Sequence, residues 1–185
     1  MIRNILPLLI LTALTACASH EPVQDTKVET ATIKPVTLPG MSRVHMARGA
    51  LLGSQPDATA LKLAHQKYGT KTVLNLRMPA EFKYFMEAQA VRDFGMEYHN
   101  IAFGPAKTLT DEVFSRALTV LRDSSKTPVL MHCKSGNRVG AIWYAHLVLD
   151  LGVQPDEAMA EARIVGLRKK GHIMRAMEYV DAMSK

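Results

Sequence analysis

The chain has 185 residues and a formal net charge of +6; 48% of its residues are hydrophobic and 22% are charged. These values are typical of an ordinary globular protein with one domain and a proper hydrophobic core, so they exclude an extended or largely disordered chain. The positive charge favours anionic partners, but only weakly.

The first 16 residues have the pattern of a secretory signal peptide. Arg3 is followed by an apolar run over Ile5–Leu14, which is too short to span a bilayer. The run ends in LTAC, residues 14–17, which resembles the lipobox of bacterial lipoproteins. The resemblance implies cleavage before Cys17, a lipid on its thiol, and a chain that is anchored in the bacterial envelope, facing the periplasm, at the outer membrane. A plain signal peptide with a chance cysteine is the alternative.

Residues 17–41 are rich in Thr, Pro and charge and lack sustained periodicity. We therefore expect a lipidated cysteine and a flexible tether over 17–41, and a folded domain over 42–185. An N-terminal strand that packs on the domain is the alternative for the segment IKPVTLP, residues 33–39.

Past the tether, hydrophobic periods of two alternate with periods of 3.6. Strands that alternate with helices predict an α/β fold with a mostly parallel central sheet and helices on both faces. The expected elements, in chain order, are two short strands within 44–56 joined by a turn at Arg48-Gly49, a helix at 56–69, a strand at 71–76, a helix at 79–95, a strand at 96–103, a helix at 108–123, a strand at 128–132, and helices at 138–152, 154–166 and 172–184.

The segment HCKSGNR, residues 132–138, follows the continuous apolar strand PVLMH and opens the next helix. Open α/β sheets bind ligands at such a place, and the free N–H groups of a helix start attract anions. Cys133 in this setting is predicted to be a thiolate and a nucleophile toward an anionic substrate, with Arg138 clamping two substrate oxygens. The residues expected to complete the binding loop are His132, Lys134, Ser135, Gly136 and Asn137.

An inert, buried Cys133 is the alternative, since free cysteines are often small core residues. The only other cysteine is Cys17, and the lipobox resemblance implies that its thiol carries a lipid. Cys133 would then have no disulfide partner within the chain. A reactive thiol is therefore the preferred interpretation.

The pattern His132-Cys133, Gly136 and Arg138 resembles the signature loop of protein tyrosine and dual-specificity phosphatases. The segments 49–77, 132–143 and 155–167 resemble, in the same order, the bacterial beta-lactamase-hydrolase-like, phosphatase-like family. This resemblance implies a cysteine-phosphatase fold, a phosphocysteine intermediate on Cys133, and a phosphate held by the loop amides and Arg138.

Two features depart from the tyrosine phosphatase pattern. Four residues separate Cys133 from Arg138, where tyrosine phosphatases usually have five, and Val139 stands where they usually have Ser or Thr. The shorter loop resembles that of rhodanese-type sulfurtransferases, which carry a persulfide. A Cys133-dependent phosphatase is the preferred function, and a sulfurtransferase or a non-catalytic anion-binding lipoprotein are the alternatives.

A phosphatase of this kind needs a general acid for the leaving oxygen. Asp111 is the only aspartate in the segment AFGPAKTLTDE, residues 102–112, which leads from the strand at 96–103 into the next helix, so it is the candidate. It could instead stabilise the start of that helix, together with Glu112 and a threonine cap. Arg77 and Glu81 follow a strand end and could face the same cleft, or form a structural salt bridge.

The remaining charged groups suggest little further chemistry. The seven histidines show no metal-ligand spacing, so we expect no metal and no cofactor. Nucleic acid is an improbable partner, because aromatic residues are not interleaved with the basic ones. A basic cluster near the C-terminus is either a solvated face or a surface that draws acidic substrates to the cleft; it consists of Arg163, Arg168, Lys169, Lys170, His172 and Arg175.

Overall fold

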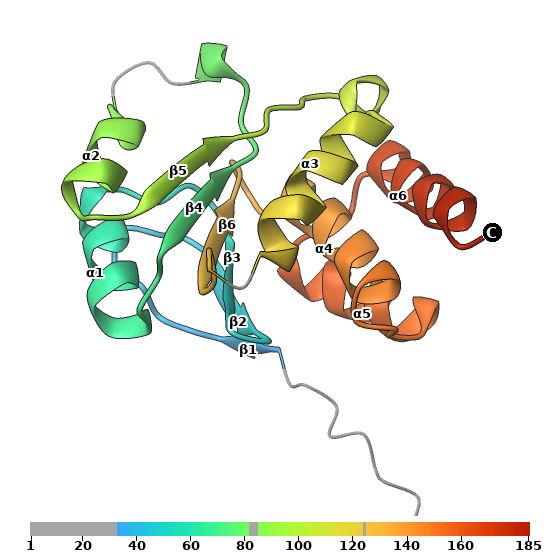
Figure 1. Cartoon of the computed structure of the whole chain (residues 1–185), viewed down its shortest axis with the longest axis horizontal. Coiled ribbons are helices and arrows are strands. Elements are labelled where there is room, and N and C mark those ends of the chain that lie inside the picture. Colours follow the sequence, from blue (N-terminus) through green and yellow to red (C-terminus); the bar gives the residue numbers. More distant parts are fainter. Residues whose placement is uncertain (1–32, 82–84, 124) are drawn as a thin grey trace, which may run out of the picture. The chain divides into compact units, whose positions relative to one another are not determined.

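In the computed structural model of the chain, the structure describes residues 33–81, 85–123 and 125–185. A six-stranded sheet lies in the order β1-β2-β3-β6-β4-β5 (Figure 1). Strands β3, β6, β4 and β5 are parallel to one another, and β2 and β1 extend the sheet beside β3 as antiparallel strands. The strands are β1 Lys34–Pro35, β2 Val44–Ala47, β3 Ala50–Gly53, β4 Thr72–Asn75, β5 Glu97–Asn100 and β6 Val129–His132.

Helices cover both faces of the sheet, as the sequence predicted. Helices α1 and α2 lie on one side, and α3, α4, α5 and α6 lie on the other (Figure 1). The helices are α1 Ala58–Tyr68, α2 Glu87–Asp93, α3 Asp111–Arg122, α4 Asn137–Leu149, α5 Pro155–Val165 and α6 Lys170–Met183, with short 3-10 turns η1 Pro79–Glu81 and η2 Ala106–Thr108.

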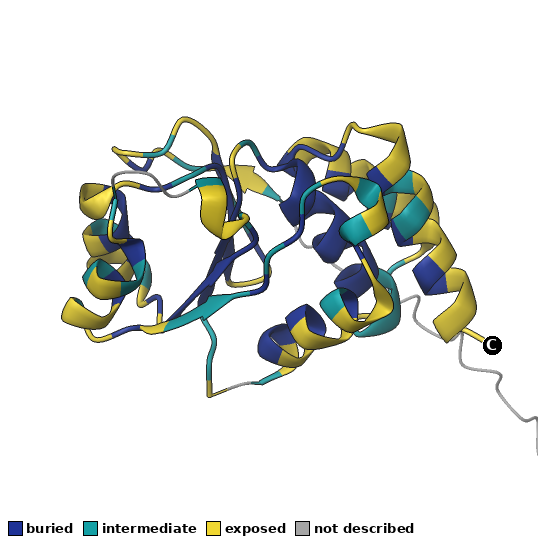
Figure 2. Ribbon diagram, turned by 90° about the horizontal axis from the view of Figure 1, so that it is seen from above, coloured by how far each residue is buried: buried dark blue, intermediate teal, exposed yellow. Residues whose placement is uncertain are grey.

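The central strand β6 explains the two-sided core. Val129 and Met131 belong to the core under α3–α6, whereas Leu130 belongs to the core under α1 and α2. Successive strand residues point to opposite faces, so a strand covered on both sides reads as a continuous apolar run. Figure 2 shows the buried strands between helices whose outer faces are exposed.

Helix α4 is the most buried helix among those described. Its residues from Asn137 to Leu147 are all buried, and it packs against α3, α5 and α6. It follows the β6 strand directly, so the loop between them is held by the sheet on one side and by the helical layer on the other.

The single helix predicted over 79–95 is wrong. The structure has the 3-10 turn η1, which ends at Glu81, and a separate helix α2, which begins at Glu87; residues 82–84 lie outside the described residues. The carboxylate of Glu81 accepts a hydrogen bond from the backbone N–H of Met78, which closes the turn. Glu87, in the first turn of α2, is buried. Glu81 and Glu87 have different partners in the fold, so the segment 79–95 does not form one helix.

The predicted domain boundary at residue 42 lies inside the compact unit, which runs from Ala31 to Lys185. The short strand β1 pairs with β2, and Leu38 is only 2% exposed in the core beside α1. The packed N-terminal strand, left open as an alternative for this segment, is what the structure contains. The signal peptide and Cys17 lie outside the described residues.

No helix in the described part of the chain is long and apolar enough to cross a membrane.

Candidate active site

The loop between β6 and α4 curls around the sulfur of Cys133. The backbone N–H of Gly136 donates a hydrogen bond to Cys133 Sγ, at 3.2 Å, and Cys133 N–H is bonded to the carbonyl of Gly53 on the neighbouring strand β3. Gly136 has a φ of +88°, and a Cβ on it would lie 2.2 Å from the carbonyl oxygen of Val165. Only glycine fits here, because both the backbone conformation and the contact exclude a side chain.

A cavity of about 300 Å³ opens at this loop. Five of the predicted site residues line this cavity. The other two predicted loop residues, His132 and Gly136, do not line it. The cavity is lined by Glu81, Gly104, Cys133, Lys134, Ser135, Asn137, Arg138, Lys169 and His172. Helix α4 begins here without a side-chain cap and without an acidic residue in its first turn, so its partial positive charge favours binding of an anion in the cavity.

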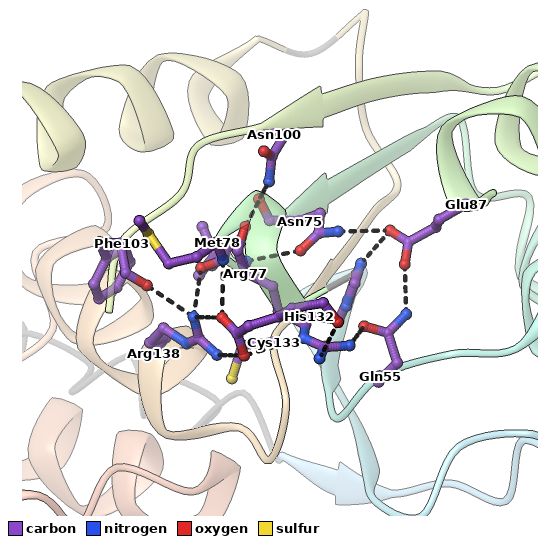
Figure 3. Close-up of polar contacts among 12 residues, drawn as sticks. Gln55, Asn75, Arg77, Met78, Glu87, Asn100, Phe103, His132, Cys133 and Arg138 are labelled. Atoms are coloured by element: carbon purple, nitrogen blue, oxygen red, sulfur yellow. Dashed lines mark hydrogen bonds and ion pairs between the residues drawn. The ribbon is translucent and has the colours of Figure 1, made fainter. Parts of the chain in front are cut away.

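Arg138 is fixed by protein oxygens on one side of its guanidinium group. Nη1 donates to the carbonyls of Leu76 and Phe103, at 3.1 and 2.8 Å. Figure 3 shows the contact with Phe103. Nη1 and Nη2 also bind the two carboxylate oxygens of Glu81, at 2.7 and 2.9 Å. These bonds orient Arg138 toward the cavity that contains the Cys133 sulfur.

The pair of Glu81 and Arg138 stays ionised over the whole neutral range. The hydrogen bond from Arg138 lowers the pKa of Glu81 to about 2, although partial burial acts in the opposite direction. Burial alone would lower the pKa of Arg138, but its hydrogen bond to Glu81 and its interaction with Cys133 raise it. Glu81 is therefore an orienting carboxylate and carries no proton to donate near neutral pH.

A buried polar network contacts the end of β6, the strand that immediately precedes Cys133. His132 Nε2 lies 2.8 Å from a carboxylate oxygen of Glu87, which also accepts hydrogen bonds from Asn75 and Gln55 (Figure 3). Burial alone would raise the pKa of Glu87, but the hydrogen bonds from His132, Gln55 and Asn75 outweigh it and the net shift is downward. Because the carboxylate is ionised, His132 Nε2 carries the hydrogen of this bond.

Asn137 joins the loop to the segment between α5 and α6. Its Oδ1 accepts hydrogen bonds from the backbone N–H groups of Arg168 and Lys169, both at 2.9 Å. Its Nδ2 lies 2.6 Å from Nδ1 of His172, whose Nε2 lies 2.9 Å from the carbonyl of Gly104. The carbonyl accepts, so His172 is protonated on Nε2 and accepts from Asn137 on Nδ1. Burial lowers the pKa of His172 and keeps it neutral.

Asp111 is not among the residues that line the cavity. It is the first residue of α3, it is 76% exposed, and it forms an ion pair with Arg175. Thr110 caps the same helix by accepting a hydrogen bond from the N–H of Val113. These contacts match the structural alternative for Asp111, and its role as a general acid stays a prediction.

Sequence reasoning missed the part that Glu87, Lys169 and His172 play. Glu87 lay within the predicted helix, and no local sequence pattern indicated that it belongs to the site. Lys169 and His172 belong to the basic cluster for which a cleft-facing surface was one of two interpretations, and both line the cavity.

Val139 is completely buried in the core, so its side chain offers nothing to the cavity. In the described residues no group of three or more His, Cys, Asp or Glu side chains is placed to hold a metal ion.

Solved structures share this fold at low sequence identity. No family model and no curated protein matches the chain. TpbA from P. aeruginosa is 20% identical, with a TM-score of 0.61 over 85% of this chain and 92% of that chain. PTPMT1 in complex with PI(5)P is 15% identical, with a TM-score of 0.63 over 73% and 92%. The core catalytic domain of the PP-IP phosphatase SIW14 from S. cerevisiae is 17% identical, with a TM-score of 0.61 over 74% and 83%. The chain therefore has the α/β fold of the cysteine phosphatases.

Proposed function

We propose that the chain is a cysteine-dependent phosphatase that hydrolyses phosphomonoesters through a phosphocysteine on Cys133. One observation carries the proposal: Cys133 Sγ accepts the N–H of Gly136 at the start of α4 and shares its cavity with the oriented Arg138. A thiolate that faces a cluster of donors and a guanidinium group is suited to attack a bound oxyanion.

The reaction has two displacements. The thiolate of Cys133 attacks phosphorus, the bond between phosphorus and the leaving oxygen breaks, and the leaving oxygen takes a proton from water and departs as the alcohol. Water then attacks the phosphocysteine, the bond between phosphorus and sulfur breaks, and inorganic phosphate leaves with the thiolate restored. Arg138 and the loop amides stabilise the negative charge on the equatorial oxygens in both steps.

The similar structures support this assignment. A cysteine-to-serine variant of TpbA is described in complex with pTyr, PTPMT1 in complex with PI(5)P, and SIW14 as a PP-IP phosphatase. The ligands pTyr and PI(5)P are phosphorylated, and an anionic phosphorylated substrate agrees with the basic groups around Cys133.

Hydrolysis of p-nitrophenyl phosphate tests the proposal directly. The protein should release p-nitrophenol, whereas Cys133→Ser should lose the activity while keeping its fold by circular dichroism. Release at the same rate by Cys133→Ser would overturn the assignment of the nucleophile.

The four-residue spacing between Cys133 and Arg138 favours a second candidate, a rhodanese-like sulfurtransferase that carries a persulfide on Cys133. Formation of thiocyanate from thiosulfate and cyanide would support it if Cys133→Ser abolished the reaction. No activity in either assay, together with measurable phosphate binding, would instead support a non-catalytic anion-binding protein.

We also propose that the chain is a lipoprotein of the bacterial envelope, facing the periplasm from the outer membrane through a lipid on Cys17. The support is the sequence LTAC after a short apolar run. Mass spectrometry of the membrane fraction should find a diacylglycerol-modified Cys17 at the new N-terminus. A Cys17→Ala chain that stayed in the membrane fraction would contradict this anchor.

A further inference from the structure

The cavity around Cys133 continues into a second hollow of about 450 Å³. Gly104, Lys169 and His172 line both hollows, so the two form one groove. We call the second hollow the outer lobe; it is lined by Gly104, Pro105, Ala106, Lys169, Gly171 and His172.

The outer lobe offers positive charge and no negative charge. Lys169 is its charged lining residue, because burial lowers the pKa of His172 and both of its ring nitrogens are already hydrogen-bonded. Within the described part of the chain, no carboxylate pairs with the ammonium group of Lys169. Helix α6 also starts beside Lys169 without an acidic residue in its first turn, which adds to the positive potential.

The position of Lys169 is tied to the loop that holds Cys133. Its backbone N–H donates to Asn137 Oδ1, and Asn137 immediately precedes Arg138. Gly166 lies against this loop as well, because a Cβ on it would be 3.0 Å from the carbonyl oxygen of Ser135. A ligand that spans the groove would therefore meet two cations, Arg138 and Lys169, whose backbones belong to one hydrogen-bonded unit.

The lobe is also shaped for a compact, polar group. Its floor consists of Gly104, Ala106 and Gly171, and a Cβ on Gly171 would meet the Cβ of Ala106 at 3.0 Å. His172 lines both parts of the groove, and among the described residues no phenylalanine, tyrosine or tryptophan lines either part. A lining of small residues and one free ammonium group suits a second phosphate better than an aromatic ring.

We infer that the groove takes a substrate with two phosphate groups, one at Cys133 and Arg138 and the other at Lys169 in the outer lobe. The inference rests on the proposed phosphatase function for the chemistry at Cys133, but the second binding site does not need turnover. The ligand class is a small bis-phosphorylated molecule in which the second phosphate lies a few bonds from the phosphate that is removed.

Binding of phosphonates tests the inference without any hydrolysis, because their carbon–phosphorus bonds are not cleaved by this chemistry. Isothermal calorimetry would compare a series of alkane bisphosphonates of increasing length with the alkyl monophosphonates of the same length. At the best length, the bisphosphonate should bind at least about tenfold tighter, as expected for one charged hydrogen-bonded contact.

Substitutions then locate the second phosphate. Lys169→Ala should remove the advantage of the bisphosphonate, so that the bisphosphonate and the monophosphonate of one length bind with similar affinity, and Lys169→Arg should restore most of the advantage. Lys170→Ala, which removes the same charge from a neighbour that lines neither hollow, should keep the advantage. Equal affinity of the two ligand types, no binding of either, or an advantage that survives Lys169→Ala would overturn the inference. If the unsubstituted protein does not hydrolyse p-nitrophenyl phosphate but still prefers the bisphosphonate, only the proposed enzyme function is overturned.

Discussion

Arg138 carries the charge that the cavity presents to a phosphate, and Glu81 fixes the direction in which this charge points. The two side chains are joined by two hydrogen bonds and come from elements 57 residues apart in the chain. A bidentate pair of this kind is geometrically specific, since both planar groups must lie in register.

Glu81→Gln should therefore impair substrate binding more than stability. The amide keeps the shape but supplies only one acceptor, so Arg138 can rotate away from the phosphate. We expect kcat/KM for p-nitrophenyl phosphate to fall by about 10- to 100-fold. The midpoint of unfolding should barely change, because Glu81 is partly exposed and such pairs contribute less than about 1 kcal/mol.

Steady-state kinetics and thermal unfolding of the same preparation check this, with Glu112→Gln on the exposed start of α3 as the control. A rise in kcat/KM would contradict the orienting role and would indicate that Glu81 competes with the phosphate.

The acid–base groups of the cavity predict a strong dependence on the leaving group. Glu81 is ionised near neutral pH, and the neutral His172 uses its Nε2 hydrogen on the carbonyl of Gly104. Neither is placed to protonate a departing alkoxide, while a phenolate leaves more readily without a proton.

Aryl phosphates should thus be hydrolysed much faster than alkyl phosphates, by a factor of about 100 or more, as expected when general acid catalysis is missing. A series of substituted phenyl phosphates, read as log kcat against the leaving-group acidity, measures the effect. A flat series that becomes steep in Asp111→Asn would instead establish Asp111 as the general acid.

At the scale of elements, the loop before α4 depends on the contact between Gly136 and the end of α5. Gly136→Ala combines a positive φ with a Cβ 2.2 Å from the carbonyl oxygen of Val165. The left-handed conformation alone costs about 1–2 kcal/mol for a residue with a Cβ, and the contact adds to this.

Gly136→Ala should lower the midpoint of thermal unfolding by at least about 2–4 °C and abolish p-nitrophenyl phosphate hydrolysis. Gly152→Ala is the matched control, because Gly152 has a φ of +65° and no atom within 4 Å of a built Cβ. It should show a similar or smaller loss of stability with full activity. Activity retained in Gly136→Ala would show that the loop tolerates a different path around Cys133.

Local sequence patterns predicted most of the elements correctly. Helix α1 begins after Asp57, whose side chain caps it, and ends at Gly69 in the left-handed conformation, as the residues at both ends indicate. The strand at 128–132 and the helix that follows were equally clear. The segment 79–95 failed because its break depends on Glu81 and Glu87, and their partners, Arg138 and His132, lie far away in the chain.

The candidate site shows the same difference between local sequence patterns and contacts of distant residues. Cys133 and Arg138 could be predicted because strand, loop and helix are continuous in sequence. Glu87, Lys169 and His172 could not be assigned, because the packing of α2 and α6 brings them to the loop. The hydrogen bonds of these residues to His132, Asn137 and Gly104 span 32 to 68 residues, and no local spacing predicts such contacts.

At the scale of the whole molecule, three histidines of the described residues make stability depend on pH. Burial lowers the pKa of His45, His146 and His172 below the usual value of 6.5. The unfolded chain therefore binds more protons than the folded one below that value, and the free energy of unfolding decreases as the pH falls. Above it, these groups are neutral in both states and contribute no slope.

The midpoint of thermal unfolding should thus stay level from about pH 8 to 7 and then drop by several degrees by about pH 5. High salt, which screens repulsion among the surface cations, should leave most of this drop in place. A midpoint that rises on acidification would contradict the assignment of neutral, buried histidines.

The central claim is that Cys133 attacks phosphorus, and trapping the intermediate tests it most directly. The protein would be mixed rapidly with p-nitrophenyl phosphate, quenched in acid, digested and examined by mass spectrometry. We predict that the peptide containing Cys133 carries one phosphoryl group, and that the group is absent without substrate. Turnover with an unmodified Cys133 peptide and a phosphoryl group on another residue would contradict the account.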